Sequence, residues 1–169
     1  MIRCLTYLIT ISVLVGCTAD AQQPNAKAVA TITATAVVVG SVDLIVMKDM
    51  EFEIASLSAT ELTVDPQSNP QSGEIKLVGT PNSLVRVTLE RQSILHHEGG
   101  VSQLFFTYNL SGSSSAVQSQ TILLTQNNQI RLSDKGVYYL WVGGRLSGIE
   151  NIVPGNYNMD LTLDVEYVL

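Results

Sequence analysis

The sequence predicts an all-β fold, and three observations carry this prediction. The chain has 169 residues, of which 46% are hydrophobic and 14% charged, a composition that suits one ordinary domain. Short runs rich in β-branched residues alternate apolar and polar positions, and turn-forming residues separate them at roughly 8–12-residue intervals. No run has a convincing helical period. We therefore expect an immunoglobulin-like antiparallel β-sandwich preceded by a signal peptide.

The N-terminal residues have the features of an export signal. Arg3 is the single charge before the apolar run Leu5–Val15, which is too short for a bilayer span of about 20 residues. Leu14–Cys17 fits a lipobox, with cleavage before Cys17 and lipidation of its sulfur. Ala19–Ala21 fits the ordinary signal peptidase instead, with cleavage after Ala21 and release of a soluble chain. Both cleavages remain open.

The predicted organisation is a signal peptide over residues 1–21, a short polar tether over 22–27 and one β-sandwich domain over 28–169. Export places the protein in the cell envelope, as an outer-membrane lipoprotein or in the periplasm, or outside the cell. The two cysteines, Cys4 and Cys17, lie in or beside the signal, so we expect neither a disulfide nor a metal cluster held by cysteine.

Charge excludes one large class of functions. The chain has 15 acidic and 9 basic residues and a formal net charge of −6. Such a balance does not favour binding to nucleic acid through the release of counterions. No nucleic acid is therefore expected among the partners.

The first and last strands have the clearest patterns. From Ala28 to Val39, Ala, Ile and Val alternate with Thr, as in a strand with one apolar face. Tyr157–Val168 alternates more strictly, and it follows Val153–Asn156, where Pro and Gly suit a type II turn. Further strands are predicted between these two at Asp43–Met47, Glu61–Val64, Glu74–Val78, Leu84–Leu89, Gln103–Leu110, Thr121–Leu124, Gln129–Leu132 and Val137–Val142.

Five motifs in order resemble a bacterial exported β-sandwich family known as domain of unknown function 4402. They are the Thr/Ala/Val-rich first strand, Asp49–Phe52, Gly79–Asn82 followed by Leu84–Leu89, Val142–Leu146, and Val153–Tyr157 running into Val165–Tyr167. The resemblance covers about Ala28 to Tyr167. It implies an exported immunoglobulin-like domain with a fimbrial-like closing strand, and it carries over no catalytic residues. Glu53 stands where the family tends to have Gly, so a turn or bulge there is expected to differ.

Two acidic or histidine-containing groups invite a metal interpretation. His96, His97 and Glu98 stand beside two glycines, but adjacent histidines on an extended backbone point in opposite directions. We expect them to be solvated loop residues. One face of the last strand has Asp160, Asp164 and Glu166, yet Ca²⁺ needs six to eight oxygens from several segments. We expect no metal or other cofactor.

Two further groups, one aromatic and one of serines, have residue types found in binding or catalytic sites. Tyr139 and Trp141 share one face of a predicted strand and Tyr138 the other, so a sugar-stacking platform competes with an ordinary core role, which we favour. The serines Ser113–Ser115 have no recognisable His and Asp partners. We therefore expect no catalytic residues and no enzyme activity.

Two hypotheses for function follow. The first is a non-catalytic structural or adhesive subunit that contacts other envelope or surface proteins, with Ala28–Val39 either donated to a neighbour or paired within its own domain. The alternative is a module that binds glycan or an envelope protein through the loops Asp65–Gly73, Ile94–Gly100 and Gly112–Gln118. The oligomeric state is left open by the sequence.

Overall fold

The computed structural model describes residues 28–38, 42–54, 60–100, 102–125, 128–150 and 152–168. The predicted signal peptide, the tether and the lipidation candidate Cys17 lie outside these residues. The strands are β1 (Ala28–Val38), β2 (Asp43–Lys48), β3 (Met50–Ile54), β4 (Glu61–Val64), β5 (Gly73–Val78), β6 (Leu84–Leu89), β7 (Gln92–His97), β8 (Gln103–Ser113), β9 (Ile122–Leu124), β10 (Asn128–Arg131), β11 (Val137–Ser147) and β12 (Asn156–Tyr167). A single 3-10 turn, η1 (Gln118–Gln120), interrupts the strands over the described part of the chain.

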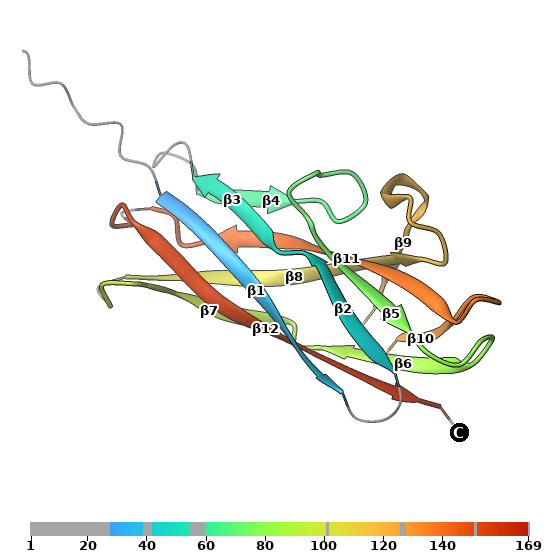
Figure 1. Ribbon diagram of the computed structural model, residues 1–169. Helices are drawn as coiled ribbons and strands as arrows, with labels where there is room; N and C mark the ends of the chain where they lie inside the picture. The colour runs from blue at the N-terminus through green and yellow to red at the C-terminus, as the bar shows by residue number, and fades with distance from the viewer. Residues whose placement is uncertain are drawn as a thin grey trace, which may run out of the picture.

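The strands pair into one twisted sheet that is nearly closed into a flattened barrel (Figure 1). Its main path runs β10-β6-β12-β7-β8-β11-β5-β2, with β9 on β8 and β4 on β11. β1 pairs with both β12 and β3, and therefore brings the path back toward β2. The predicted all-β fold is confirmed. No helix in the described segments has the length and apolarity needed to cross a bilayer.

Two strands change partners partway along, and this folds the sheet over on itself. β2 pairs with β5, but after Asp49 the chain continues as β3 and pairs with β1. β11 pairs with β5 up to Val142 and with β4 from Gly144 onward. A Cβ on Gly143 would lie 2.3 Å from the Val64 carbonyl oxygen, so the close approach at this change of partner requires glycine.

β1 departs from the all-antiparallel expectation. It runs parallel to β12 over the register Val29↔Asn156 to Val38↔Val165, and antiparallel to β3 from Ala28↔Ile54 to Ile32↔Met50. The first strand therefore pairs within its own chain, inserted between the last strand and β3. Period-two alternation specifies a buried face but not the direction of the neighbouring strand.

The core lies between the two layers of the flattened barrel. β12 follows its predicted alternation: Tyr157, Met159, Leu161, Leu163 and Val165 are buried and the residues between them are exposed. Ala30 and Ile32 of β1 enter the same core. The alternation therefore identified the inward face of β12 correctly, and that of β1 at Ala30 and Ile32.

Two strands were not predicted. β3 alternates acidic with apolar residues over only five positions, and β7 begins with polar residues and ends in two histidines. The prediction of a loop from Ile94 was wrong up to His97, because Gln92–His96 pair with Gln103–Thr107 of β8. Pairing with an apolar neighbour makes such a segment a strand even where its own pattern is weak.

Candidate functional site: the exposed edge strand β2

β2 is an apolar strand at the edge of the β5–β11–β8 layer. Its sequence, DLIVMK, places an acid first, a base last and four apolar residues between them. Among the described residues it pairs with β5 alone, and it also contacts β1. Ile45 is 44% exposed, Val46 37% and Met47 55%. Edge strands are usually interrupted by charges, prolines or bulges; between Asp43 and Lys48, β2 has no charge or proline but does have a bulge.

A β-bulge at Met47 determines which way each β2 side chain points. Asp43 and Ile45 pair with Val78 and Lys76 of β5, but the register shifts between Val46 and Lys48, so that Lys48 pairs with Glu74. Because 74, 76 and 78 of β5 lie on one face, Asp43, Ile45 and Lys48 all lie on the outer face. Leu44 and Val46 point to the inner side, and Met47 is the extra residue of the bulge.

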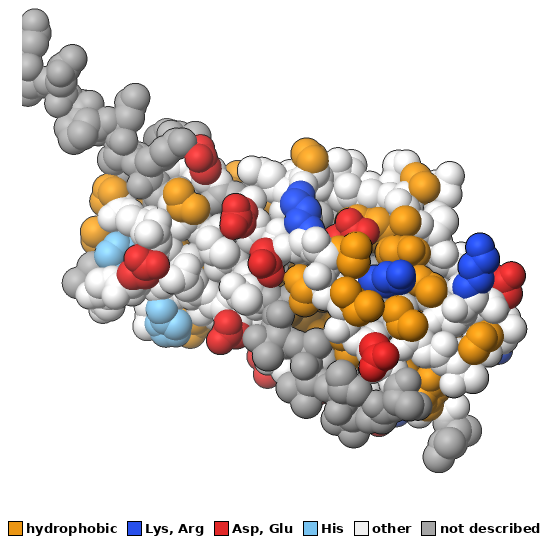
Figure 2. All heavy atoms as spheres, in the orientation of Figure 1, with side chains coloured by type: hydrophobic (Ala, Val, Ile, Leu, Met, Phe, Trp, Pro, Cys, Tyr) orange, Lys and Arg blue, Asp and Glu red, His pale blue; other side chains and the backbone are white. Residues whose placement is uncertain are grey.

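The outer face beside β2 is apolar with one cation at its centre. Figure 2 shows hydrophobic side chains gathered over β2 and β5 around a basic side chain. Tyr139 of β11 pairs with Lys76, whose Nζ lies 6.0 Å from the centroid of the Tyr139 ring. The Tyr139 and Trp141 rings are 6.1 Å apart and inclined by 33°. Lys76 therefore lies against the aromatic pair, in the range of a cation–π contact.

Trp141 is buried, but on the outer face. It is 4% exposed and does not belong to the main core cluster, which Tyr138, Leu140 and Val142 enter from the same strand. The loop that contains Pro66 runs beside it: Ser111, the cross-strand partner of Trp141, donates a hydrogen bond from Oγ to the Pro66 carbonyl at 3.1 Å. The predicted burial of Trp141 is confirmed, and the covered indole cannot serve as an open sugar platform.

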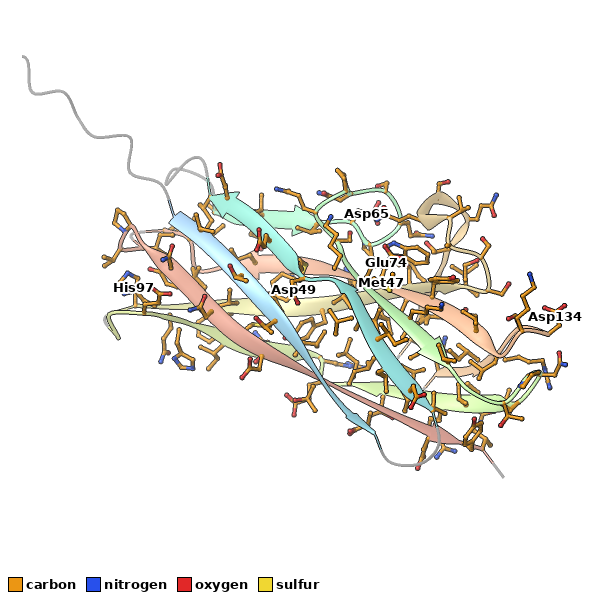
Figure 3. The ribbon with its side chains drawn as sticks, in the orientation of Figure 1. Met47, Asp49, Asp65, Glu74, His97 and Asp134 are labelled. Atoms are coloured by element: carbon orange, nitrogen blue, oxygen red, sulfur yellow. The ribbon has the colours of Figure 1, made fainter. Side chains whose placement is uncertain are left out.

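The loop after β4 is held down by a polar network. Gln118 of η1 donates from Nε2 to the carbonyls of Pro66 (3.1 Å) and Asn69 (2.9 Å), and Lys48 Nζ donates to the Pro70 carbonyl. Asp65 accepts from the Gln67 backbone N–H at 3.0 Å and from Ser68 Oγ at 2.7 Å, which lowers the pKa of Asp65. This network anchors both the loop and the C-terminal end of β2. In Figure 3, Asp65, Glu74 and Met47 are labelled in this part of the molecule.

The histidine cluster stands at the opposite end of the barrel from Asp134 (Figure 3). His97 Nδ1 accepts from the Gly99 backbone N–H at 2.9 Å, and its ring packs edge-on against Tyr157 at 5.0 Å. Glu98 accepts from the side-chain amides of Asn156 and Asn158, both at 3.1 Å, and these bonds lower its pKa. The cluster thus joins the end of β7 to the start of β12.

The acidic face of β12 is solvated, as expected. Asp160, Asp164 and Glu166 are all exposed, and Glu166 pairs with Arg86 of β6 at 2.6 Å. Within the described segments, no group of three or more His, Cys, Asp or Glu side chains is arranged to hold a metal ion. Ser113 and Ser115 bond to each other and, through Ser115, to Gln120.

A cleft of about 310 Å³ opens between β6 and β8, which are not neighbours in the sheet. Leu89, Tyr108 and Leu124 are among the residues that line it. The Tyr108 hydroxyl points to Met159 Sδ at 3.7 Å, and burial raises the pKa of this phenol well above its ordinary value. Polar and charged residues, among them Glu90, Arg91 and Asn109, also line the cleft, which marks the seam at which the barrel stays open.

The motif residues of the sequence do not converge on one place. Gly79 and Thr80 pack against the Tyr167 hydroxyl, which accepts from the Thr80 backbone N–H at 2.8 Å. Gly143 and Gly144 lie where β11 changes partners, and Glu53 pairs regularly with Val29. These motifs therefore lie at turns and strand junctions and stabilise the fold there. β2, which lies between the first two motifs, was predicted as a strand, but its exposure could not be read from its apolar pattern.

The fold and these surfaces define an all-β, nearly closed barrel domain in which the apolar strand β2 has exposed side chains. The family model described as "Domain of unknown function (DUF4402)" matches residues 21–167, and the chain belongs to this family. The predicted family resemblance is thereby confirmed. No curated protein matches the chain.

Proposed function

We propose that the protein is an exported, non-catalytic subunit of the cell envelope or cell surface that acts through contacts with other proteins. The observation that supports this most is β2, a strand with three consecutive exposed apolar side chains that, within the described segments, pairs with β5 alone. Exposed apolar side chains grouped in this way are typical of surfaces that contact other proteins.

The signal-peptide pattern over residues 1–21 supports export. The alternative, a module that binds glycan through an aromatic face, has less support because Trp141 is covered and Tyr139 is already in contact with Lys76. The loop Asp65–Gly73, a candidate for recognition, is tied to η1 and β2 by the bonds described above.

The test uses the full chain expressed in its host. A photo-reactive benzoylphenylalanine is placed at position 45 on β2 or, as the control, at Thr162, an exposed residue of β12 that pairs with Thr35 of β1. We expect processed protein in the envelope or medium, with an intact mass that begins at Cys17 with acyl chains or at Gln22. We also expect protein crosslinks from position 45 and none from position 162.

An unprocessed chain that stays in the cytoplasm would overturn the proposal of export. The absence of any protein crosslink at position 45, or equal crosslinking at 162, would overturn the proposed role of β2 in protein contacts.

A further inference from the structure

We propose that the cleft between β6 and β8 binds the alkyl chain of a single-chain amphiphile whose anionic head group lies against Arg91. The inference goes beyond the proposed function, because it assigns a small-molecule site to a cleft that no residue of β2 lines. Three observations carry it: the cleft opens into the core, its inner wall is apolar, and one cation points inward at its mouth.

The cleft opens into the space between the two layers of the barrel. Its inner wall includes Val87, Leu89, Tyr108 and Leu110, which belong to the core cluster and are each at most 9% exposed. A packed protein interior leaves few voids larger than a water molecule, whereas this cleft has about 310 Å³. At about 30 Å³ for each water-sized group, that volume accommodates a chain of roughly ten carbon atoms.

The inner wall has no spare hydrogen-bonding group for a polar ligand. The hydroxyl of Tyr108 is directed to Met159 Sδ at 3.7 Å and is bonded to Ser93, so it is already engaged. Among the described residues, no buried side-chain nitrogen or oxygen lacks a hydrogen-bond partner. A polar group placed there would lose its hydrogen bonds to water without replacing them. The part of a ligand that enters the cleft must therefore be apolar.

Arg91 points to the inner side at the mouth of the cleft, and two observations place it there. The buried positions of β6 are 85, 87 and 89, and their alternation continues to 91. The Tyr108 backbone N–H donates to the Arg91 carbonyl at 2.9 Å, which extends the pairing of Gln92 with Thr107 and sets Arg91 opposite the inward residue Tyr108. Arg91 is nevertheless exposed, because the two layers are parted here. The same alternation turns Glu90 to the outer face.

No carboxylate of the described residues forms an ion pair with Arg91. Ion pairs in the described part of the chain join Arg86 to Glu166 and Arg145 to Glu61, and Arg91 takes part in neither. A guanidinium forms paired, charge-assisted hydrogen bonds with a carboxylate or a phosphate. An alkyl chain that ends in such an anion would use the apolar wall and the inward cation together. An inward charge that only guards an open seam against association would need no ligand, and the experiments below distinguish the two roles.

The first experiment is calorimetric titration of the processed full chain at pH 7 with three probes, each kept below the concentration at which it forms micelles. Decanoate and decyl phosphate distinguish a carboxylate head group from a phosphate. Decyltrimethylammonium has a chain of the same length with the opposite charge. We expect one saturable site per chain for at least one of the two anions, and binding of the cation that is about tenfold weaker or more.

The second experiment uses two matched pairs of variants, each checked for folding by circular dichroism. Arg91→Gln should weaken binding of the anion about tenfold, whereas Arg86→Gln, on the outer side of β6, should leave it within about twofold. Leu124→Trp fills the cleft and should abolish binding. Leu123→Trp changes the neighbouring residue, which is 61% exposed and does not line the cleft, and should leave binding unchanged.

One saturable anion site that is weakened by R91Q but not by R86Q supports the inference. The absence of saturable binding, a cation that binds as tightly as the anions, or an anion affinity that R91Q leaves unchanged overturns it. If L124W does not fold, the comparison of R91Q with R86Q still decides. None of these results depends on the crosslinks from β2, so this inference and the proposed function can fail separately.

Discussion

Single residues hold the corners of this fold through close backbone contacts. Gly136 has a φ of +71°, and a Cβ there would lie 2.1 Å from the Gly79 carbonyl oxygen. The Gly79 backbone N–H donates to the Gly136 carbonyl at 2.8 Å, which ties the turn before β11 to the turn after β5. Gly100 has nearly the same φ, +69°, but a Cβ there meets nothing within 4 Å. A side chain at Gly100 would therefore cause backbone strain alone, whereas a side chain at Gly136 would cause the same strain and a steric clash.

We expect Gly136→Ala to cost more stability than Gly100→Ala. The control, Gly100→Ala, should lose about 1–2 kcal/mol, the cost of an L-residue in the left-handed region. Gly136→Ala should lose that amount and a further contribution from the clash, about 3 kcal/mol or more in total. Urea unfolding of both variants measures the difference, and equal losses would contradict the contact described here.

Tyr108 should make the fold sensitive to alkali. Burial raises the pKa of its phenol, so the folded state keeps a proton that the unfolded chain releases above about pH 10. The folded state then binds more protons, and stability falls as the pH rises. Tyr138 adds an effect of the same sign, because burial raises its pKa too.

Tyr108→Phe should therefore reduce the loss of folding stability above about pH 10. It should not abolish that loss, because Tyr138 also contributes. Urea unfolding at several pH values between about 8 and 11 is the measurement. At pH 7 the variant should differ by about 1 kcal/mol or less, because the hydroxyl's bond to the Met159 sulfur is long, at 3.7 Å, and its bond to Ser93 is between neutral groups. Stability curves that stay parallel to the wild type up to pH 11 would refute the prediction.

At the scale of elements, β1 is a strand of the protein's own core. Ile32 is 2% exposed and pairs with Met159 of β12 and Met50 of β3, whereas the next residue, Thr33, is exposed. Pairing within the chain means that β1 stabilises the molecule in which it resides. A strand supplied by a neighbour would instead make stability depend on protein concentration.

We expect Ile32→Ala to lose about 2–5 kcal/mol and Thr33→Ala about 0.5 kcal/mol or less. Both changes are made together with Ile45→Lys, so that the proposed β2 contact does not contribute. In that setting the unfolding midpoints should not change with protein concentration. A midpoint that rises with concentration would show that β1 is exchanged between copies.

At the scale of the whole molecule, one core cluster spans both layers, and its strands come from both ends of the chain. β1 pairs with β12, so the barrel cannot close until the last strand has been made and folded. Folds dominated by such distant pairings form slowly, in roughly milliseconds to seconds. Single domains of this size usually unfold in one cooperative step.

The fluorescence of Trp141, the one tryptophan of the chain, can be used to follow both cooperative unfolding and the rate of refolding. Its blue-shifted emission should be lost in the same urea range as the β-sheet signal in circular dichroism, because the loop over Trp141 is tied to β2 and η1. Refolding followed by its fluorescence should take roughly milliseconds to seconds. Two separated transitions would mean that the outer-face loop opens independently of the core.

The sequence by itself determined the all-β class, most strand positions and the inward faces of β1 and β12, because period-two alternation reports directly on a surface that is half buried. It did not determine that β1 runs parallel to β12, or that β3 and β7 are strands, because those depend on neighbours far away in the chain. The alternation predicts which face of β11 Trp141 lies on. It does not predict that the loop containing Pro66 lies beside Trp141 on that face.

The candidate site divides in the same way. An apolar run such as β2 is typical of a buried strand, and nothing local distinguishes it from one that lies at an edge. Only the tertiary structure decided that β2 pairs with β5 alone within the described segments, that Met47 is a bulge and that Asp43 and Lys48 share a face. Exposure and register are properties of the assembled sheet, since both depend on which strands lie next to one another.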